Sequence, residues 1–256
     1  MKPVPVRRRA LDVLVSVDRG GHLDPLLDRA LGALPEARDR AFCAQLVRGT
    51  LQWRGRYDHL IKRFAKRRPP TDPGILNLLL MSLHQLIGQD GVPAYAAIHQ
   101  AGELCRGLKG GARAVGFVNG MLQSVRREIV GGDGDGADLV QGRLRQAFVD
   151  LEKDPAAWCA AWHSHPRWLV DRWTRAWGGD TADKICAHNN QPVPVVFHVL
   201  EPADPVEMAG RLAERGLAVD EGPGPRALVV PNRPGRDAIA EVLRDLPGLI
   251  VQDVTV

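Results

Sequence analysis

Residues 6–18 have the sequence Val-Arg-Arg-Arg-Ala-Leu-Asp-Val-Leu-Val-Ser-Val-Asp, and this stretch decides the fold class. Its apolar residues recur at helical spacing, and three consecutive arginines surround its first turn. The pattern predicts an amphipathic helix whose N-terminal turn is strongly basic. The apolar positions are Ala10, Val13, Leu14 and Val17, and the arginines are Arg7, Arg8 and Arg9.

The same helical periodicity continues to about residue 129, and glycines and prolines divide it into segments of helical length. Long apolar-periodic segments with short connections are typical of a helical bundle. Residues 1–130 are therefore predicted to form an all-α domain. The further helices are predicted over residues 23–34, 35–53, 57–66, 73–87, 93–108 and 112–129.

Residues 131–136 have the sequence Gly-Gly-Asp-Gly-Asp-Gly, which offers nothing to bury. The net charge also reverses here, because the chain up to residue 130 carries 21 basic and 11 acidic side chains and the remainder carries 13 and 19. We expect a domain boundary at this point and a Gly/Asp-rich linker over residues 131–142. A calcium loop is excluded, because Ala137 occupies a ligand position and Asp138 the position of the required glycine.

Two further regions follow the linker. Residues 143–192 are predicted to form a helical connector, and residues 193–256 alternate between short β-rich segments and helical segments. Their order, strand–helix–strand–strand–helix–strand, is that of a small α+β unit of the split βαβ, or RRM-like, type. The chain is thus expected to be mainly α. The connector helices are predicted at about 143–152, 167–177 and 182–188, the strands at 193–200, 217–219, 227–230 and 249–253, and the last helices at 206–215 and 238–245.

The composition is that of a soluble globular chain, with 45% hydrophobic and 25% charged residues among 256. The longest apolar stretch, residues 75–83, is far shorter than the roughly 18–20 residues of a membrane span. Asp12 and Asp18 interrupt the N-terminal apolar run, so we expect no signal peptide. The cysteines lie far apart, which favours a reduced, cytoplasmic protein. They are Cys43, Cys105, Cys159 and Cys186.

Several runs in the first half resemble a known domain family. They are Lys-Pro at residues 2–3, Arg-Arg-Arg-Ala at residues 7–10, Val-Pro-Ala-Tyr-Ala-Ala-Ile at residues 92–98 and Gly-Phe-Val-Asn-Gly-Met-Leu at residues 116–122. These runs and the helix series are similar to the NusB-like RNA-binding domain. The resemblance implies a helical bundle that binds RNA.

Two later runs resemble a narrower family. Ser-His-Pro-Arg-Trp-Leu-Val-Asp-Arg-Trp at residues 164–173 and Asn-Asn-Gln-Pro-Val-Pro at residues 189–194 are similar to the connector of the RsmB (Sun) type of ribosomal RNA cytosine-5 methyltransferase. In that family a NusB-like domain, a helical connector and an RRM-like unit precede a Rossmann-type domain that binds S-adenosylmethionine. The resemblance implies small-subunit ribosomal RNA as the partner.

The catalytic motifs of that family do not occur in these 256 residues. Its members use a Pro-Cys motif and a Thr-Cys-Ser motif, through which a thiolate attacks C6 of cytosine. Neither motif nor the glycine-rich cofactor loop is found here, so we assign no catalytic residue and no cofactor to this chain. Residues 249–253 resemble the strand that leads into the catalytic domain. We expect a truncated or split enzyme that recognises RNA, with S-adenosylmethionine bound by a missing domain or a separate catalytic chain.

A different class of function also fits the N-terminal half. A NusB-like transcription antitermination factor would bind a short RNA element and a protein partner through the bundle. Such factors normally end near the close of the bundle, which would leave residues 137–256 without a purpose. A pure scaffold is a third hypothesis, and RNA affinity insensitive to salt would favour it, because phosphate binding releases counterions.

Two basic clusters are the candidate RNA-binding sites. The first lies where the positive end of the first helix adds to its charge, and the NusB-like resemblance implies that it contacts RNA. The second precedes a proline pair. For both, the alternative is a solvated helix surface. The clusters are Arg7, Arg8 and Arg9, and Lys66, Arg67 and Arg68.

A cysteine and two histidines of the connector invite comparison with a metal site. Cys159, His163 and His165 are residue types that zinc accepts, but the sequence shows no fourth ligand. We therefore predict a structural role and no metal. The nearby tryptophans recur at roughly helical intervals, which is more typical of packing than of base stacking. They are Trp158, Trp162, Trp168, Trp173 and Trp177.

Overall fold

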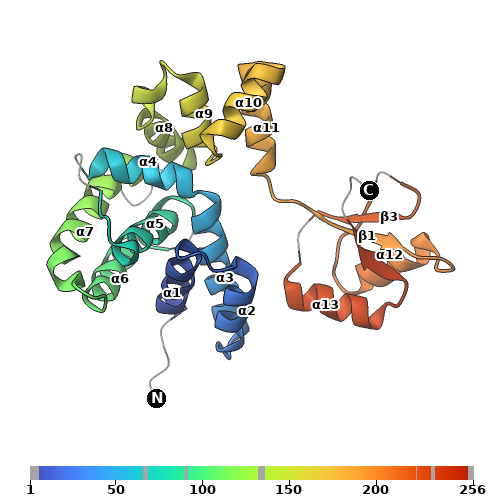
Figure 1. The fold of residues 1–256 in the computed structure, drawn as a ribbon. Helices are drawn as coiled ribbons and strands as arrows, with labels where there is room; N and C mark the ends of the chain where they lie inside the picture. The colour runs from blue at the N-terminus through green and yellow to red at the C-terminus, as the bar shows by residue number, and fades with distance from the viewer. Residues whose placement is uncertain are drawn as a thin grey trace. The chain divides into compact units, whose positions relative to one another are not determined.

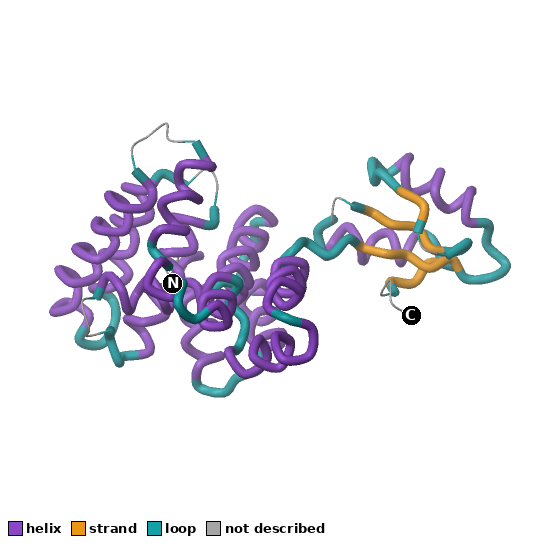
Figure 2. The backbone as a smooth tube through the Cα atoms, turned by 90° about the horizontal axis from the view of Figure 1, so that it is seen from above, coloured by secondary structure: helices purple, strands orange, loops and turns teal. Residues whose placement is uncertain are grey.

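The computed structural model describes residues 6–65, 69–89, 92–131, 136–222, 224–231 and 234–252 (Figure 1). The chain divides into two compact units, Met1–Asn190 and Gln191–Val256. The first unit is helical, and the second combines a four-stranded sheet with helices (Figure 2). The prediction of a mainly α protein with a small α+β unit is confirmed.

Helix α5 (Pro73–Ile87) lies at the centre of the first unit. Eleven of its residues are buried, as expected of a helix that is hydrophobic on nearly every side. Asp72 caps this helix by accepting a hydrogen bond from the backbone N–H of Ile75 at 3.0 Å, and Pro73 occupies the first helical position. The helices packed around α5 are α1 (Val6–Asp18), α3 (Ala37–Gln52), α4 (Arg54–Phe64), α6 (Ala94–Arg106) and α7 (Gly111–Val125), and α2 (Leu23–Gly32) packs on α1 and α3.

His84 of α5 fills the space between α5 and α3. Its Nδ1 lies 3.0 Å from the hydroxyl of Tyr57 on α4, and its ring is buried. A Cβ added at Gly49 would lie only 2.1 Å from His84 Nε2, so the two helices can approach this closely only with glycine at residue 49. Burial lowers the pKa of His84 to about 4, so its imidazole is neutral at physiological pH.

The bundle helices agree with the sequence pattern, with one shift at the start of α4. This helix begins at Arg54 rather than at residue 57, because the carbonyl of Trp53 already accepts a helical hydrogen bond from the backbone N–H of Tyr57 at 3.1 Å. Among the described residues, no helix combines the length and the apolar character that a bilayer crossing requires.

The connector differs most from its prediction. A linker is predicted over residues 131–142, but a helix begins inside that range at Ala137. Arg143 holds this helix against the end of the bundle by donating to the carbonyls of Ile129 and Val130 at 2.8 and 2.9 Å. The connector elements are η1 (Arg126–Val130), α8 (Ala137–Gln146), η2 (Val149–Leu151), α9 (Pro155–Trp162), α10 (Arg167–Trp177) and α11 (Gly179–Asn189).

The hydrophobic core of the bundle extends into the connector. Leu144, Ala147 and Phe148 are buried in the same core as the bundle helices, and Trp158 and Trp162 pack against it. The division between compact units consequently falls after Asn190, not near residue 130, where composition and charge change. The boundary between the units depends on which helices share a core, and the sequence pattern does not show which distant segments pack together.

The second unit is a four-stranded sheet in the order β2-β3-β1-β4, with antiparallel neighbours. Alternate residues of the central strand, among them Phe197, face a core shared with both helices. A strand is predicted at residues 217–219, but pairing begins only at Asp220; Leu217 and Val219 instead pack against the core. The elements are β1 (Val195–Val199), α12 (Pro205–Glu214), β2 (Asp220–Glu221), β3 (Ala227–Val230), α13 (Arg236–Asp245) and β4 (Leu249–Val251).

Candidate nucleic-acid interface

Arg7 lies in the first turn of α1, and its side chain contacts α3 and α5. Its Nε donates to Oε1 of Gln85 at 2.7 Å, and its guanidinium lies 4.9 Å from the ring centre of Phe42. Gln85 is itself buried. Burial lowers the pKa of Arg7, but the pKa of a guanidinium is so high that the side chain remains charged at neutral pH. Arg7 therefore contributes to helix packing as well as to surface charge.

Arg8 and Arg9 point to different neighbours, as consecutive residues of a helix must. Arg8 donates to Asp12 at 3.0 Å and to the carbonyl of Gly107 at 3.2 Å, just beyond the end of α6. Arg9 lies near Cys43 of α3, where its charge opposes the effect of burial, which raises the pKa of that thiol to about 11. Only Arg8 thus reaches the connection between α6 and α7.

The connection between α6 and α7 carries a basic cluster that the sequence analysis missed. Arg106, Lys109 and Arg113 are exposed there, although Arg106 pairs with Glu103, and residues 104–127 contain five basic and no acidic side chains. This acid-free run is the signal that could have identified the cluster. No acidic residue lies in the first turn of α1 or of α7, so the positive end of each helix adds to the cluster. We call Arg8, Arg106, Lys109 and Arg113 the basic turn surface.

Two glycines shape this turn. Gly110 has a φ of +72°, a left-handed conformation that glycine adopts without strain. A Cβ at Gly111 would lie 1.8 Å from the carbonyl oxygen of Cys105, so α7 can start this close to the end of α6 only with glycine. The turn therefore holds Lys109 two residues from Gly107, whose carbonyl accepts a hydrogen bond from Arg8 of α1.

A shallow hollow adjoins the basic turn surface. Lys109 and Phe117 line it together with Ile75, Ala114 and the acidic residue Asp72. Phe117 is 38% exposed, although most phenylalanines in folded proteins are buried. An exposed aromatic ring beside a lysine is the combination that stacks on an unpaired base while the cation binds its phosphate.

The second predicted cluster, Lys66, Arg67 and Arg68, lies outside the described residues. The prediction that it binds RNA is carried forward unchanged. Of the two clusters predicted from sequence, the structure therefore describes only Arg7, Arg8 and Arg9. These three side chains have different neighbours: Gln85, Gly107 and Cys43, respectively.

The connector docks on α4 through Arg56. The guanidinium lies between two indole rings, 4.0 Å from the centre of Trp53 and 4.4 Å from that of Trp162. Its Nε also donates to the carbonyl of Trp162 at 2.7 Å. Burial lowers the pKa of Arg56 to about 10. This arginine therefore holds the connector against α4.

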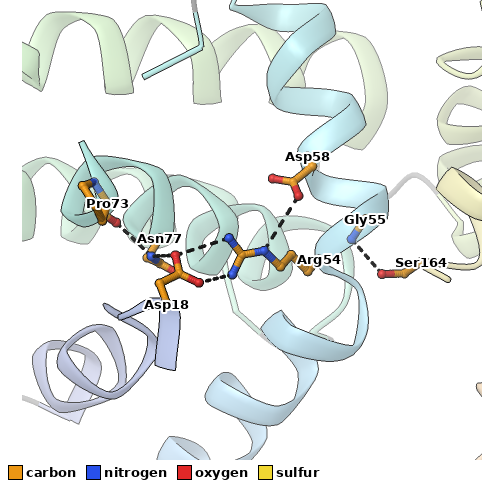
Figure 3. A network of polar contacts seen from close by, with 7 residues as sticks. All are labelled: Asp18, Arg54, Gly55, Asp58, Pro73, Asn77 and Ser164. Carbon is orange, nitrogen blue, oxygen red and sulfur yellow. Dashed lines mark hydrogen bonds and ion pairs between the residues drawn. The ribbon is translucent and has the colours of Figure 1, made fainter. Parts of the chain in front are cut away.

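A polar network next to Arg56 joins α1, α4 and α5 (Figure 3). Arg54 pairs with Asp18, and Asn77 donates to Asp18 at 2.6 Å and to the carbonyl of Pro73 at 2.9 Å. Burial acts to raise the pKa of Asp18, but the hydrogen bonds from Arg54 and Asn77 outweigh it, and the pKa is lowered. The carboxylate is therefore held in its charged form.

The residues that resemble the RsmB-type connector contact both the end of α3 and the start of α4. Ser164 Oγ accepts a hydrogen bond from the backbone N–H of Gly55 at 2.7 Å (Figure 3). The carbonyl of Asn190 accepts from Gln52 at 3.1 Å, and the side chain of Asn190 donates to the carbonyl of His163 at 2.8 Å. These motifs thus hold the connector against the bundle.

The connector tryptophans divide into packed and exposed residues. Trp158 and Trp162 stack at 5.4 Å between ring centres, and Trp173 packs on the small core between α9, α10 and α11. Trp168 and Trp177 are 65% and 57% exposed. The prediction that these tryptophans serve packing therefore holds for Trp158, Trp162 and Trp173, but not for Trp168 and Trp177.

Comparison with protein families agrees with this architecture. Residues 4–127 match the model of the NusB family, and residues 165–234 match the ferredoxin-like domain of RsmF/B-like methyltransferases. The chain is therefore of the class in which a NusB-type bundle precedes a ferredoxin-like domain. It belongs to the NusB/RsmB family.

Individual relatives cover both units. A Bacillus subtilis (strain 168) protein named "Probable ribosomal RNA small subunit methyltransferase B" is 31% identical over 225 residues, which are 87% of this chain and 46% of that protein. The "Ribosomal RNA small subunit methyltransferase B" of Xanthomonas campestris pv. campestris (strain ATCC 33913 / DSM 3586 / NCPPB 528 / LMG 568 / P 25) is 29% identical over 255 residues, 99% of this chain and 51% of that protein. The chain spans about half the length of these curated relatives.

The crystal structure of PH0851 has a similar fold. It matches with a TM-score of 0.54 at 16% sequence identity, over 98% of this chain and 54% of that one. At this identity the likeness concerns the fold alone.

Proposed function

We propose that this chain binds small-subunit ribosomal RNA through the basic turn surface, as the RNA-recognition part of an RsmB-like methyltransferase. The observation that carries the proposal is the contact between Arg8 and Gly107, which brings the arginine cluster of α1 beside the basic turn between α6 and α7. The names of the relatives support ribosomal RNA as the ligand.

The chemistry of this surface suits single-stranded RNA. Guanidinium and ammonium groups neutralise phosphates, and each contact releases counterions from the RNA. Phe117 offers its ring to an unstacked base, a mode that sequence-specific RNA-binding domains use. Lys66, Arg67 and Arg68 would extend the same phosphate binding.

Methyl transfer, in this proposal, belongs to residues outside these 256, whether in the same polypeptide or in a separate chain. The Pro-Cys and Thr-Cys-Ser motifs and the cofactor loop are not among the 256 residues, so S-adenosylmethionine would be bound elsewhere. A methylation assay with these residues alone is expected to yield no 5-methylcytosine in small-subunit ribosomal RNA. Product formation would contradict this assignment.

RNA titrations at several salt concentrations test the binding surface. Arg106→Ala/Lys109→Ala/Arg113→Ala is expected to weaken binding to a small-subunit ribosomal RNA transcript. Because each lost phosphate contact on single-stranded RNA removes about 0.7 from the slope of log affinity against log salt, the loss of Lys109 and Arg113 should lower the slope by about 1.4. Arg106, which pairs with Glu103, should add less than a full contact.

A charge-matched control separates local contact from overall charge. Arg211→Ala/Arg215→Ala/Arg244→Ala removes three exposed arginines from the second unit and is expected to leave the slope nearly unchanged. Equal effects of the two triple variants, or no binding by the unsubstituted chain at low salt, would overturn the proposal.

The antitermination hypothesis lacks comparable support. Relatives match this chain across both units, and the second family model lies within the connector and the second unit. An antitermination factor would need only the bundle.

A further inference from the structure

Two helices of the connector bring four metal-ligand side chains together. Cys159 lies on α9, and His163 follows four residues later at the end of that helix. Asp183 and Cys186 lie three residues apart on α11, which packs against α9. Residues three or four apart share one face of a helix, so each helix directs a pair of side chains toward the other.

Three of these side chains have ligand atoms that lie close together. One ligand atom each of Cys159, His163 and Asp183 lies within 4.8 Å of the other two, and His163 Nε2 lies 2.9 Å from Asp183 Oδ1. Cys186 lies outside this group of three but is buried in the same small core as Cys159, so its thiol would have to turn toward the group to complete the site. Ligands bound to zinc at about 2.0–2.3 Å are themselves roughly 3–4 Å apart, so the three grouped side chains need only small adjustments.

We propose that Cys159, His163, Asp183 and Cys186 bind one divalent transition-metal ion, with zinc as the best-suited ion. Thiolate, imidazole and carboxylate are the ligand types of zinc, and two helices with ligand pairs can supply a four-coordinate site. The proposal is independent of RNA binding. It replaces the prediction of no metal, which considered Cys159, His163 and His165 only.

His165 is not part of this site. Its Nδ1 lies 2.8 Å from the carbonyl of His163, and its ring lies 5.8 Å from that of Trp173, centre to centre. The fourth ligand comes instead from α11, more than twenty residues later in the chain than Cys159. Sequence spacing alone could not reveal it.

Burial and access both suit a tightly held ion. Cys159, His163 and Cys186 are 5%, 8% and 0% exposed, so they are shielded from bulk water. Cys159 and Asp183 also line the hollow between α9 and α11, which gives an ion a path to the site. A site closed by the protein and reached from one side is typical of structural zinc.

The charges of the ligand set call for a cation. With an ion bound, the site would hold two thiolates and one carboxylate, and each thiol would release its proton to solvent. A divalent cation would supply two opposite charges. Arg56, which donates to the carbonyl of Trp162 beside His163, would offset the remaining negative charge.

The ion would fasten the connector at the point where it docks. His163 precedes Ser164, which binds α4, and its carbonyl accepts from Asn190 at the end of α11. Binding that exists only in the folded state stabilises that state. Metal at this site is therefore expected to stabilise the packing of α9 and α11 rather than to take part in catalysis.

Metal content and cobalt spectroscopy test the site. The chain is kept reduced with a non-chelating phosphine, dialysed against zinc, passed over a chelating resin, and measured for zinc per chain by mass spectrometry. One zinc per chain is expected. Cobalt in place of zinc is expected to give a thiolate-to-cobalt charge-transfer band and the intense visible bands of tetrahedral coordination.

Three substitutions identify the ligands. Cys159→Ser, Asp183→Asn and Cys186→Ser are each expected to weaken metal binding by more than about 100-fold, beyond the loss that second-shell changes cause. Cys105→Ser is the matched control: Cys105 is also fully buried, and a serine hydroxyl can keep its hydrogen bond to the carbonyl of Gly111. It should bind zinc like the unsubstituted chain.

The outcomes separate a metal site from a purely structural cluster. Asp183 is half exposed, and asparagine keeps a hydrogen-bonding group beside His163, so the Asp183→Asn variant is expected to fold with an unchanged circular dichroism spectrum. Failure of the unsubstituted reduced chain to retain zinc would overturn the proposal. Full zinc retention by folded Asp183→Asn and by Cys186→Ser would overturn it equally.

Discussion

Arg7 and Arg8 are adjacent in sequence, but they should differ in what their loss does to the protein. Arg7 donates to buried Gln85 and lies over Phe42, whereas Arg8 donates to exposed Asp12 and to the carbonyl of Gly107. We predict that Arg7→Ala lowers the free energy of unfolding more than Arg8→Ala does. Arg8→Ala should show its main effect in RNA binding.

The expected difference follows from these contacts. Removing Arg7 leaves Oε1 of Gln85 without its donor, which costs about 1–3 kcal/mol for a buried acceptor, and removes a cation–π contact that contributes about 0.5–1 kcal/mol. Partial exposure of the pair reduces the sum, so Arg7→Ala should destabilise by about 2 kcal/mol. In the ion pair of Arg8 with Asp12, Arg8 is half-buried and Asp12 is exposed, and the pair should contribute less than about 1 kcal/mol.

Urea unfolding followed by tryptophan fluorescence measures this difference. All six tryptophans lie before residue 190, so the signal reports on the first unit alone. A second substitution, Gln85→Leu, removes the acceptor. In that background Arg7→Ala should cost clearly less, because no orphaned oxygen remains.

The reasoning would be refuted by equal destabilisation in the two single variants, or by an unchanged cost of Arg7→Ala in the Gln85→Leu background. In RNA titrations, Arg8→Ala should lower the salt slope by about 0.7. A larger slope change in Arg7→Ala would mean that Arg7 leaves Gln85 to bind phosphate.

Two further predictions concern residues buried between helices. The pKa of His84 is about 4 in the folded chain and about 6.5 when unfolded, so the unfolded state binds more protons between these values and stability is lost as pH falls through this window. From pH 7 to pH 5 the loss should be about 2 kcal/mol, and His84→Gln should abolish that part of the pH dependence in urea titrations; an identical pH dependence would contradict the assignment. Arg56→Lys keeps the charge but not the planar group between Trp53 and Trp162, so it should destabilise the first unit by about 1–2 kcal/mol in the same assay. Stability equal to that of the unsubstituted chain would show that stacking contributes nothing.

The bundle could be predicted from sequence because its signals are local. Helix α5 carries its own cap at Asp72, its own proline at Pro73 and an apolar run that only a buried helix tolerates. The order of elements in the second unit was likewise readable from alternating periods. Family resemblance added the RsmB-type connector, whose residues Ser164 and Asn190 contact α4 and the end of α3, respectively.

The failures share a different cause. A glycine-rich run does predict a break, yet Arg143 brings the following helix back onto the bundle through the carbonyls of Ile129 and Val130. The strand predicted at residues 217–219 uses its apolar residues for the core instead of the sheet. Both outcomes depend on contacts between residues distant in sequence, which periodicity does not encode.

The candidate site shows the same limit in its charges. Counting arginines in the first seventy residues overstates the charge available to RNA, because several are held by the fold. Arg7 lies against Gln85, Arg54 pairs with Asp18, and Arg56 lies between two tryptophans. A count of basic residues therefore adds together those that stabilise the fold and those that are available to bind RNA.

Whether a basic side chain has an ion-pair partner in the protein distinguishes these two roles, and it points to residues beyond the first seventy. Among the residues that the structure describes, Lys109 and Arg113 make no ion pair and are exposed, and they stand on a turn that Gly110 and Gly111 hold in place. A charge without a protein partner retains its full attraction for phosphate, whereas a paired one must first lose its contact. For this reason we propose that RNA binding is centred on the turn between α6 and α7, with Arg8 of the N-terminal arginine cluster at its edge.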